Sequence, residues 1–425
     1  MDQTVSRTRR PWHRRTRLSI VPAVVLVLTL ASSATAAQVG TAHLGPRQQE
    51  IDASHLGTTQ QKIAAIARAA MRKYHLKALI LRVTTDGRNT YTGALGESMT
   101  GVPATPKMHV RNGFVAYSYL TTLLLELVDR HKISLDDTLA TYLPNLPRAK
   151  AVTVKMLANS TSGYADYVYQ PAVLDGINRN PFRQWTTREL IRIGTSARPT
   201  FPPGTNWAYA HTNYAILGRV LAKAGGQPLG RLMKHYIFRP MNLRETQGST
   251  TPQIPEPVLH TYSSERRETL KIPPGTPFYE DTTYWNPSWT APRGASQTSD
   301  VKDLTTSIAA IGSGSLLTPK SHRVQVGHHL VGFGHPAKGC PACARNTRAR
   351  SFGLGVVLQG PWITGDKFYA GSGAEVGYLP SAKLAIAVIT TFTARGFDRQ
   401  GNATDVGPAI LARLSKALAP RHPIP

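Results

Sequence analysis

The chain has 425 residues, 41% of them hydrophobic, which is enough for one large domain or two ordinary ones with a substantial core. Its formal net charge is +26, from 50 Lys and Arg against 24 Asp and Glu, so its surface should attract anionic partners. An arginine excess that keeps an exported protein soluble is an equal explanation. No nucleic-acid-binding motif accompanies the charge, so we expect no nucleic-acid partner.

Residues 1–36 predict a signal peptide. Six arginines precede an apolar run from Leu18 to Leu30, and the small-residue site Ala34-Thr35-Ala36 follows. We expect cleavage there and a secreted, extracytoplasmic protein on the cell-wall side, with an uncleaved signal anchor as the alternative. The six arginines and one aspartate of this segment carry five net charges, which leaves +21 on the mature part. Residues 37–57 are polar and aperiodic, which indicates a linker.

The next elements differ in their periodicity. Residues 58–74 carry apolar side chains at helical spacing, whereas residues 77–84 and 90–96 are β-rich runs separated by the hairpin signal Asp86-Gly87-Arg88. The stretch from Arg111 to Pro144 predicts one long, mostly apolar helix followed by a tight acidic turn. Its apolar residues occupy several faces, so we expect the helix to be buried. It is too short and too polar to cross a bilayer, so we expect no transmembrane span in the mature chain.

Several motifs then follow in order along the chain. They are the Leu-Asp-Asp run that ends at Asp137, Thr-Ser-Gly and Asp-Tyr within residues 152–167, Pro-Gly-Thr and Leu-Gly within 201–218, Phe-Arg-Pro-Met within 237–246, and Trp289 before Gly-Ala. This series resembles the penicillin-recognising serine hydrolases, which include serine β-lactamases, D-alanyl-D-alanine carboxypeptidases and related esterases. The resemblance covers roughly residues 60 to 418.

The resemblance implies an α/β (α+β) fold of the β-lactamase and penicillin-binding-protein type, with an antiparallel sheet flanked by helices and a helical subdomain. We expect one domain over residues 58–420, with the α/β part at about 58–110 and 350–420 and the helical part at about 111–349. At the C-terminal end, β-rich runs at 352–359, 367–371 and 384–392 and a helix at 409–419 complete the α/β part.

The catalytic positions of this family are substituted here. The family forms an acyl-enzyme on a serine, with a lysine one helical turn later as its base. In the register of the Leu-Asp-Asp run, these positions hold Phe114 and Tyr117. The family's Tyr-x-Asn loop keeps Tyr209 but has His211 for the asparagine, and its His-x-Gly or Lys-Thr-Gly strand reads Gly371-Ser372-Gly373. A tyrosine, with a free pKa of about 10, is no lysine-type base near neutral pH. We therefore assign no catalytic residue.

We hypothesise an exported family member that has lost acyl-enzyme chemistry, needs no cofactor, and binds a peptidoglycan stem peptide or an anionic cell-wall polymer. The expected ligand-binding residues are Tyr117, Tyr209, His211, Trp289 and Ser372. Their aromatic members, with Phe114, either line a pocket for a peptide or sugar or fill the vacated site as core.

Two alternatives remain for the function. The chain is either an active serine-type hydrolase (carboxypeptidase, β-lactamase or esterase) with a rebuilt site that uses Ser118, His211 or Ser372, or a purely structural or signalling wall protein. A mid-helix hydroxyl bonded to a backbone carbonyl is the simpler interpretation of Ser118.

The two cysteines of the chain, Cys340 and Cys343, predict a local disulfide in an exported protein. A structural zinc site that includes His328, His329 and His335 is the alternative. A single Cys-x-x-Cys and irregular histidine spacing disfavour zinc, so we expect no metal.

Overall fold

The computed structural model describes residues 57–113, 115–249 and 251–425. The predicted signal peptide, the linker up to residue 56 and Phe114 lie outside the described residues. In the described ranges, no helix has both the length and the apolar character needed to cross a membrane.

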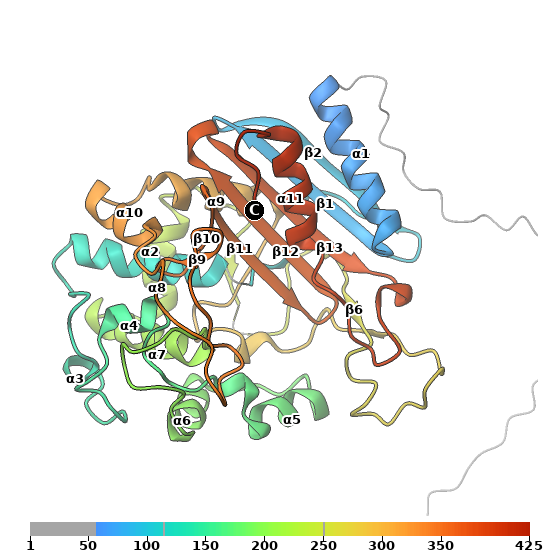
Figure 1. The fold of residues 1–425 in the computed structure, drawn as a ribbon. Helices are drawn as coiled ribbons and strands as arrows, with labels where there is room; N and C mark the ends of the chain where they lie inside the picture. The colour runs from blue at the N-terminus through green and yellow to red at the C-terminus, as the bar shows by residue number, and fades with distance from the viewer. Residues whose placement is uncertain (1–56, 114, 250) are drawn as a thin grey trace, which may run out of the picture. The chain divides into compact units, whose positions relative to one another are not determined.

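An eight-stranded antiparallel sheet organises the fold, with the strand order β3-β2-β1-β13-β12-β11-β10-β9 (Figure 1). Its strands are β1 Leu76–Thr85, β2 Arg88–Met99, β3 Val102–Pro103, β9 Ser351–Phe352, β10 Val357–Gln359, β11 Trp362–Tyr369, β12 Ser372–Leu379 and β13 Leu384–Phe392. Because β1 pairs with β13, segments from the two ends of the described chain meet at the centre of the sheet.

The remaining elements lie mostly between β3 and β9 in sequence. The helices are α1 Thr58–Lys73, α2 Val115–Asp129, α3 Leu139–Tyr142, α4 Val154–Ala158, η2 Tyr167–Tyr169, α5 Pro171–Arg179, α6 Thr187–Ser196, α7 His211–Ala224, α8 Leu229–Met233, η3 Lys234–Phe238, η4 Pro287–Trp289, α9 Val301–Ser313, α10 Pro319–Val326, η5 Pro380–Ala382, η6 Ala394–Gly396 and α11 Gly407–Leu418. A small three-stranded sheet has the order β4 Val110–Arg111, β8 Gln297–Ser299 and β5 Gln247–Gly248. A two-stranded sheet pairs β6 Tyr262–Ser263 with β7 Glu280–Asp281.

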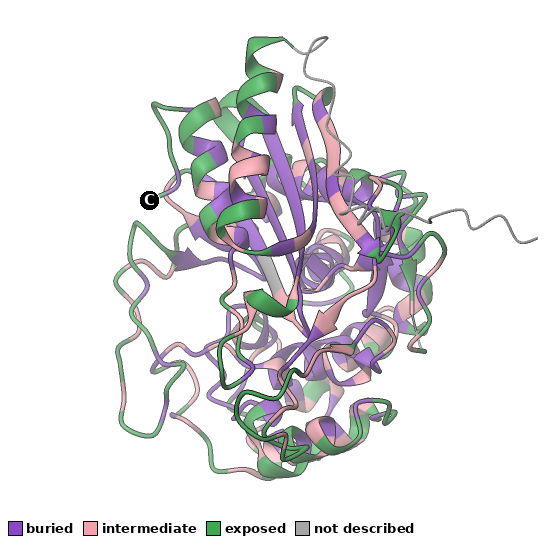
Figure 2. Ribbon diagram, turned by 90° about the vertical axis from the view of Figure 1, so that its right-hand side faces the viewer, coloured by how far each residue is buried: buried purple, intermediate pink, exposed green. Residues whose placement is uncertain are grey.

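Helices cover both faces of the large sheet because side chains alternate along its strands. Leu79 of β1 lies in a buried cluster with residues of α1 and α11. Its neighbour Ile80 lies in a second and larger cluster with residues of α2, α7 and α9. Figure 2 shows the strands largely buried, whereas the outward faces of the covering helices are exposed. The antiparallel sheet with flanking helices and a helical part confirms the expected fold class.

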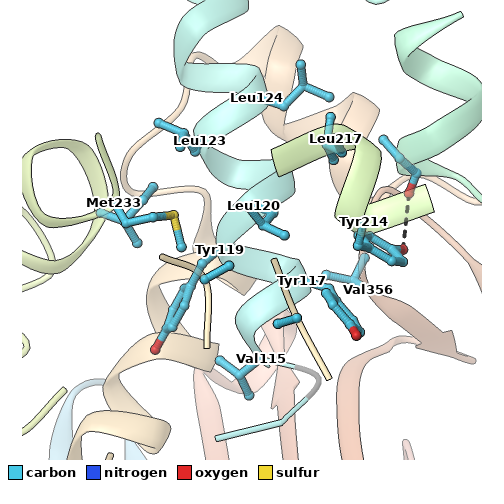
Figure 3. Packing of buried hydrophobic residues seen from close by; sticks show 14 of the residues in the cluster. Val115, Tyr117, Tyr119, Leu120, Leu123, Leu124, Tyr214, Leu217, Met233 and Val356 are labelled. Atoms are coloured by element: carbon cyan, nitrogen blue, oxygen red, sulfur yellow. Dashed lines mark hydrogen bonds between the residues drawn. The ribbon is translucent and has the colours of Figure 1, made fainter. Parts of the chain in front are cut away.

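Helix α2 is buried on all sides, as its sequence predicts. Leu120, Leu123 and Leu124 have no exposed surface, and they point in different directions from the helix axis in Figure 3. Tyr214 of α7 and Met233 of α8 pack around the helix in the same cluster. The predicted helix is nevertheless too long at its start, because Arg111 belongs to the short strand β4.

The C-terminal strands differ in part from the prediction. The run at 352–359 forms two short strands, β9 and β10, because the chain turns through Gly355, whose φ is 62°. The expected strand at 367–371 is wrong at its end, because Ala370 and Gly371 form the turn between β11 and β12. Strand β12 was not anticipated, since all eight of its residues are buried and it lacks the alternation that marks a half-exposed strand.

Candidate functional site

A cavity of about 490 Å³ lies where the start of α2, the approach to α7 and the segments around β8 and β9 meet. This volume is in the range of small-molecule sites. Its walls are formed by Arg111, Asn112, Gly113, Ala116, Tyr117, Trp207, Tyr209, His211, Trp289, Thr290, Ala291, Ser296, Gln297, Ala344, Arg345, Asn346, Thr347, Arg350, Ser351, Phe352, Val357, Phe368 and Tyr369.

Four of the predicted ligand-binding residues line this cavity, and we call them the aromatic wall: Tyr117, Tyr209, His211 and Trp289. The ring of Tyr117 lies 6.2 Å from that of Tyr209 and 6.1 Å from that of His211. The ring of Trp289 lies 6.2 Å from that of His211. The structure therefore brings these four side chains together, and they line a cavity.

Tyr117, at the lysine position, is held by internal contacts. Its hydroxyl donates a hydrogen bond to the backbone carbonyl of Thr290, and its ring stacks on Tyr214 at 4.1 Å. Burial raises the pKa of Tyr117 far above its ordinary value, although a hydrogen bond with Tyr209 opposes this shift. Burial also raises the pKa of Tyr209. Both phenols are therefore neutral near pH 7 and neither is a base.

His211 is the polar member of the aromatic wall. It begins α7, and its Nδ1 lies 2.8 Å from the Oδ2 atom of Asp166. Asp166 is itself fixed, because its Oδ1 accepts a hydrogen bond from the amide of Val168. The contact with Asp166 fixes the orientation of the His211 imidazole at the cavity, as a general base requires. An imidazole can act as a base only on a nucleophile within hydrogen-bonding reach.

At the first position of the family's strand motif, where a histidine or lysine is usual, this chain makes a turn at Gly371 and offers no side chain. Gly371 has a φ of 75°, and a Cβ there would lie 1.5 Å from the carbonyl oxygen of Tyr262. A histidine or lysine therefore cannot stand at this position without displacing the backbone around Tyr262.

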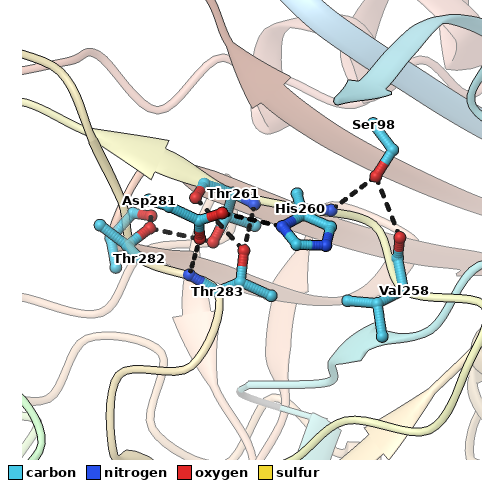
Figure 4. A network of polar contacts seen from close by, with 8 residues as sticks. Ser98, Val258, His260, Thr261, Asp281, Thr282 and Thr283 are labelled. Carbon is cyan, nitrogen blue, oxygen red and sulfur yellow. Dashed lines mark hydrogen bonds and ion pairs between the residues drawn. The ribbon is translucent and has the colours of Figure 1, made fainter. Parts of the chain in front are cut away.

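The segment that crowds this turn is held in place by a polar network (Figure 4). His260 is held by two contacts. Its backbone amide donates a hydrogen bond to the Oγ atom of Ser98 in β2, and its Nδ1 lies 2.8 Å from the Oδ2 atom of Asp281. Thr282 donates a hydrogen bond of 2.6 Å to the carbonyl of Ala370, the residue before Gly371. The network thus ties the turn between β11 and β12 to the segment around β6 and β7.

Two of the predicted hydroxyls do not reach the cavity. Ser372 is buried in β12, which lies between β11 and β13 and is no edge strand, and it does not line the cavity. Ser372 therefore lies away from the cavity, because the turn directs the chain into the sheet one residue earlier. Ser118 is buried in α2 and donates a 2.7 Å hydrogen bond to the carbonyl of Gly355, which is the simpler of its two predicted roles.

A serine that the sequence did not single out does line the cavity. Ser351 stands at the start of β9, and its Oγ lies 2.9 Å from Nδ1 of His328. No local motif marks this pair, because the two residues are 23 positions apart and meet only through the folding of the segment between them.

The two cysteines are joined in a disulfide, with their Cα atoms 5.3 Å apart. The bridge packs against Phe201 and Ala208, and the residues after it, Ala344 to Thr347, form part of the cavity wall. In the described ranges, no cluster of three or more His, Cys, Asp or Glu side chains is arranged to hold a metal ion.

Three further wall residues were also missed, and we call them the donor wall: Arg111, Trp207 and Gln297. Each has a buried nitrogen without a hydrogen-bond partner, namely Nη1 of Arg111, Nε1 of Trp207 and Nε2 of Gln297. Arg111 stands three residues before the nucleophile position, which is the sequence signal that could have placed it near the cleft.

Comparisons with known proteins agree with this fold. A family model described as Beta-lactamase matches residues 63–409. Penicillin-binding protein 4 of Amycolatopsis lactamdurans is 29% identical over 193 residues, 44% of this chain and 48% of that protein. D-alanyl-D-alanine-carboxypeptidase/endopeptidase AmpH of Escherichia coli is 27% identical over 178 residues, 40% of this chain and 45% of that protein. The matched region spans about half the length of these curated relatives, or less.

Solved structures share the fold. The D-amino acid amidase of Ochrobactrum anthropi SV3, in complex with D-phenylalanine, superimposes with a TM-score of 0.69 at 19% identity and covers 85% of this chain and 99% of its own. The D-stereospecific amidohydrolase from Streptomyces gives a TM-score of 0.67 at 22% identity, with 84% and 98% covered.

Proposed function

The chain belongs to the beta-lactamase family, and from this premise we propose that it binds a ligand in the family's cleft without forming an acyl-enzyme. The ligand that we propose is a peptidoglycan stem peptide or an anionic wall polymer, met outside the cytoplasm after export. The single observation that supports this function most is Tyr117, a neutral phenol held against Thr290 where the family has its lysine.

The other catalytic positions support the same proposal. Phe114 has no nucleophilic atom, and Gly371 leaves no room for a charge-stabilising side chain. The cavity nevertheless keeps its volume, and its aromatic wall offers stacking surfaces for a peptide or sugar. Loss of the reacting groups together with retention of the pocket is what a binding protein derived from an acylating enzyme requires.

Covalent labelling tests the proposal. The mature protein is incubated with a fluorescent penicillin, denatured and run on a gel, beside an active D-alanyl-D-alanine carboxypeptidase as the positive control. We expect no label on this protein, and calorimetry should detect reversible binding of an N-acetylated stem pentapeptide. A label that survives denaturation and maps to one serine would overturn the proposal.

One observation supports a second candidate, a serine hydrolase with a rebuilt site. The Ser351 hydroxyl lines the cavity and touches an imidazole nitrogen of His328, as a nucleophile and its base would. An alkyl fluorophosphonate probe separates the candidates, with Ser351→Ala as the test variant and Ser118→Ala as the control. Labelling that is lost only in Ser351→Ala would establish the hydrolase, whereas we expect no labelling of the wild-type protein.

A further inference from the structure

One side of the cavity is formed by a long segment without regular secondary structure. Residues 327–350, which we call the strap, run from the end of α10 to the start of β9 and contain no helix or strand. Segments of this length without secondary structure are uncommon in compact proteins and often act as lids or binding loops. Residues 344–347 and Arg350 of the strap line the cavity. The position of the strap therefore decides whether the cavity has this side.

The strap is attached to the segment that leads into α7. The side chain of Asn206 donates a 3.0 Å hydrogen bond to the carbonyl of His335 and accepts a 2.9 Å hydrogen bond from the His335 amide. The amide of Ala344 donates a hydrogen bond of 3.4 Å to the carbonyl of Trp207. These few polar contacts join the strap to the approach to the aromatic wall.

The disulfide is the apolar centre of this attachment. Cys340 and Cys343 pack with Phe201 and Ala208 in a small buried cluster, which is separate from the two large clusters of the core. Cys343 also forms an isolated β-bridge with Ala208. Ordering a segment as long as the strap costs much conformational entropy, and so small a cluster offsets little of it. The covalent bridge lowers this cost because it removes conformations from the open strap.

Thiol chemistry can act on this protein at one place. Cys340 and Cys343 are the two cysteines of the whole chain. Both are buried, but Gly339, Pro341 and Ala342 beside them are exposed, so the bridge lies directly below the surface. Because its cluster is separate from the core, breaking the bridge should open the strap and leave the large sheet and α2 folded.

We infer that the disulfide between Cys340 and Cys343 is a redox-sensitive clasp, which holds the strap against the cavity and releases it on reduction. A dithiol attacks one sulfur of the bridge and forms a mixed disulfide with it. The dithiol then closes its own disulfide, and its two hydrogens end on the sulfurs of Cys340 and Cys343. The inference rests on the proposed binding function and adds that ligand binding needs the oxidised chain.

Hydrogen exchange followed by mass spectrometry tests the clasp on the protein with and without dithiothreitol, while intact mass reports the state of the bridge. We expect peptides that contain the amides of Ala344 and Asn346 to exchange at least about tenfold faster after reduction, because both amides are hydrogen-bonded when the strap is in place. Peptides from α2 should keep their rates. Cys340→Ser combined with Cys343→Ser should exchange fast in the strap whether or not dithiothreitol is present.

Calorimetry with the N-acetylated stem pentapeptide measures the consequence for the cavity. The reduced protein should bind at least about tenfold more weakly than the oxidised protein, because the apparent affinity scales with the fraction of molecules that have the strap in place. The double serine variant should bind as weakly as the reduced protein. Reoxidation of the wild-type protein with oxidised glutathione should restore the affinity, whereas the same treatment should leave the double variant unchanged.

Three results overturn the clasp. They are a bridge that dithiothreitol does not reduce in the folded protein, equal exchange of the strap in both states, and an equal acceleration in α2, which would make the bridge a general stabiliser. Equal pentapeptide affinity of the oxidised and reduced protein also overturns the inference and leaves the proposed function standing. If strap exchange depends on the bridge while a fluorescent penicillin acylates the protein, the proposed function fails and the clasp stands.

Discussion

The former catalytic positions and the donor wall differ in how their polar atoms are satisfied. At the former catalytic positions, the hydroxyl of Tyr117 is bonded to a backbone carbonyl and the imidazole of His211 to Asp166. Arg111 of the donor wall and Trp289 of the aromatic wall each keep a buried nitrogen without a partner. The comparison teaches that the polar groups at the former catalytic positions have become internal structure. Variants at these positions should therefore change stability.

The largest expected effect comes from filling the turn that replaced the strand motif. Gly371→Ala should lower the free energy of unfolding by about 3 kcal/mol or more, because the added Cβ meets the Tyr262 carbonyl and the residue keeps a positive φ. Gly226→Ala is the matched control, because its φ is 65° and a Cβ there meets nothing within 4 Å. It should cost only about 1 kcal/mol for the backbone strain. Urea unfolding measures both, and equal losses would contradict the steric account of the turn.

A smaller effect is expected from the lysine position itself. Tyr117→Phe removes the hydrogen bond to Thr290 and should lower the free energy of unfolding by about 1–2 kcal/mol. Tyr169→Phe, at a side chain that is 68% exposed, should change it by less than about 0.5 kcal/mol.

Reversion of the catalytic pair should produce no measurable gain. Phe114→Ser combined with Tyr117→Lys restores a serine and a base, but Gly371 still offers no side chain and His211 still replaces the asparagine. We expect no fluorescent-penicillin label on this double variant. Labelling would show that the aromatic wall still holds the geometry for acyl transfer.

The sequence by itself determined the fold class. The Leu-Asp-Asp register also predicts which residues stand at the serine and lysine positions of the family, 114 and 117, because a helix of known phase puts its residues on known faces. Motif order likewise brought Tyr209, His211 and Trp289 to one cavity.

Only the tertiary structure decided which polar atoms are paired. Ser372 was expected to face a ligand, yet the turn at Gly371 buries it in β12. Arg111, Gln297 and the pair of Ser351 with His328 come from segments far apart in sequence, and no local pattern records where their donors point. The physical reason is that hydrogen-bond satisfaction depends on atoms brought together by long-range contacts, whereas helix phase and motif order are properties of the local chain.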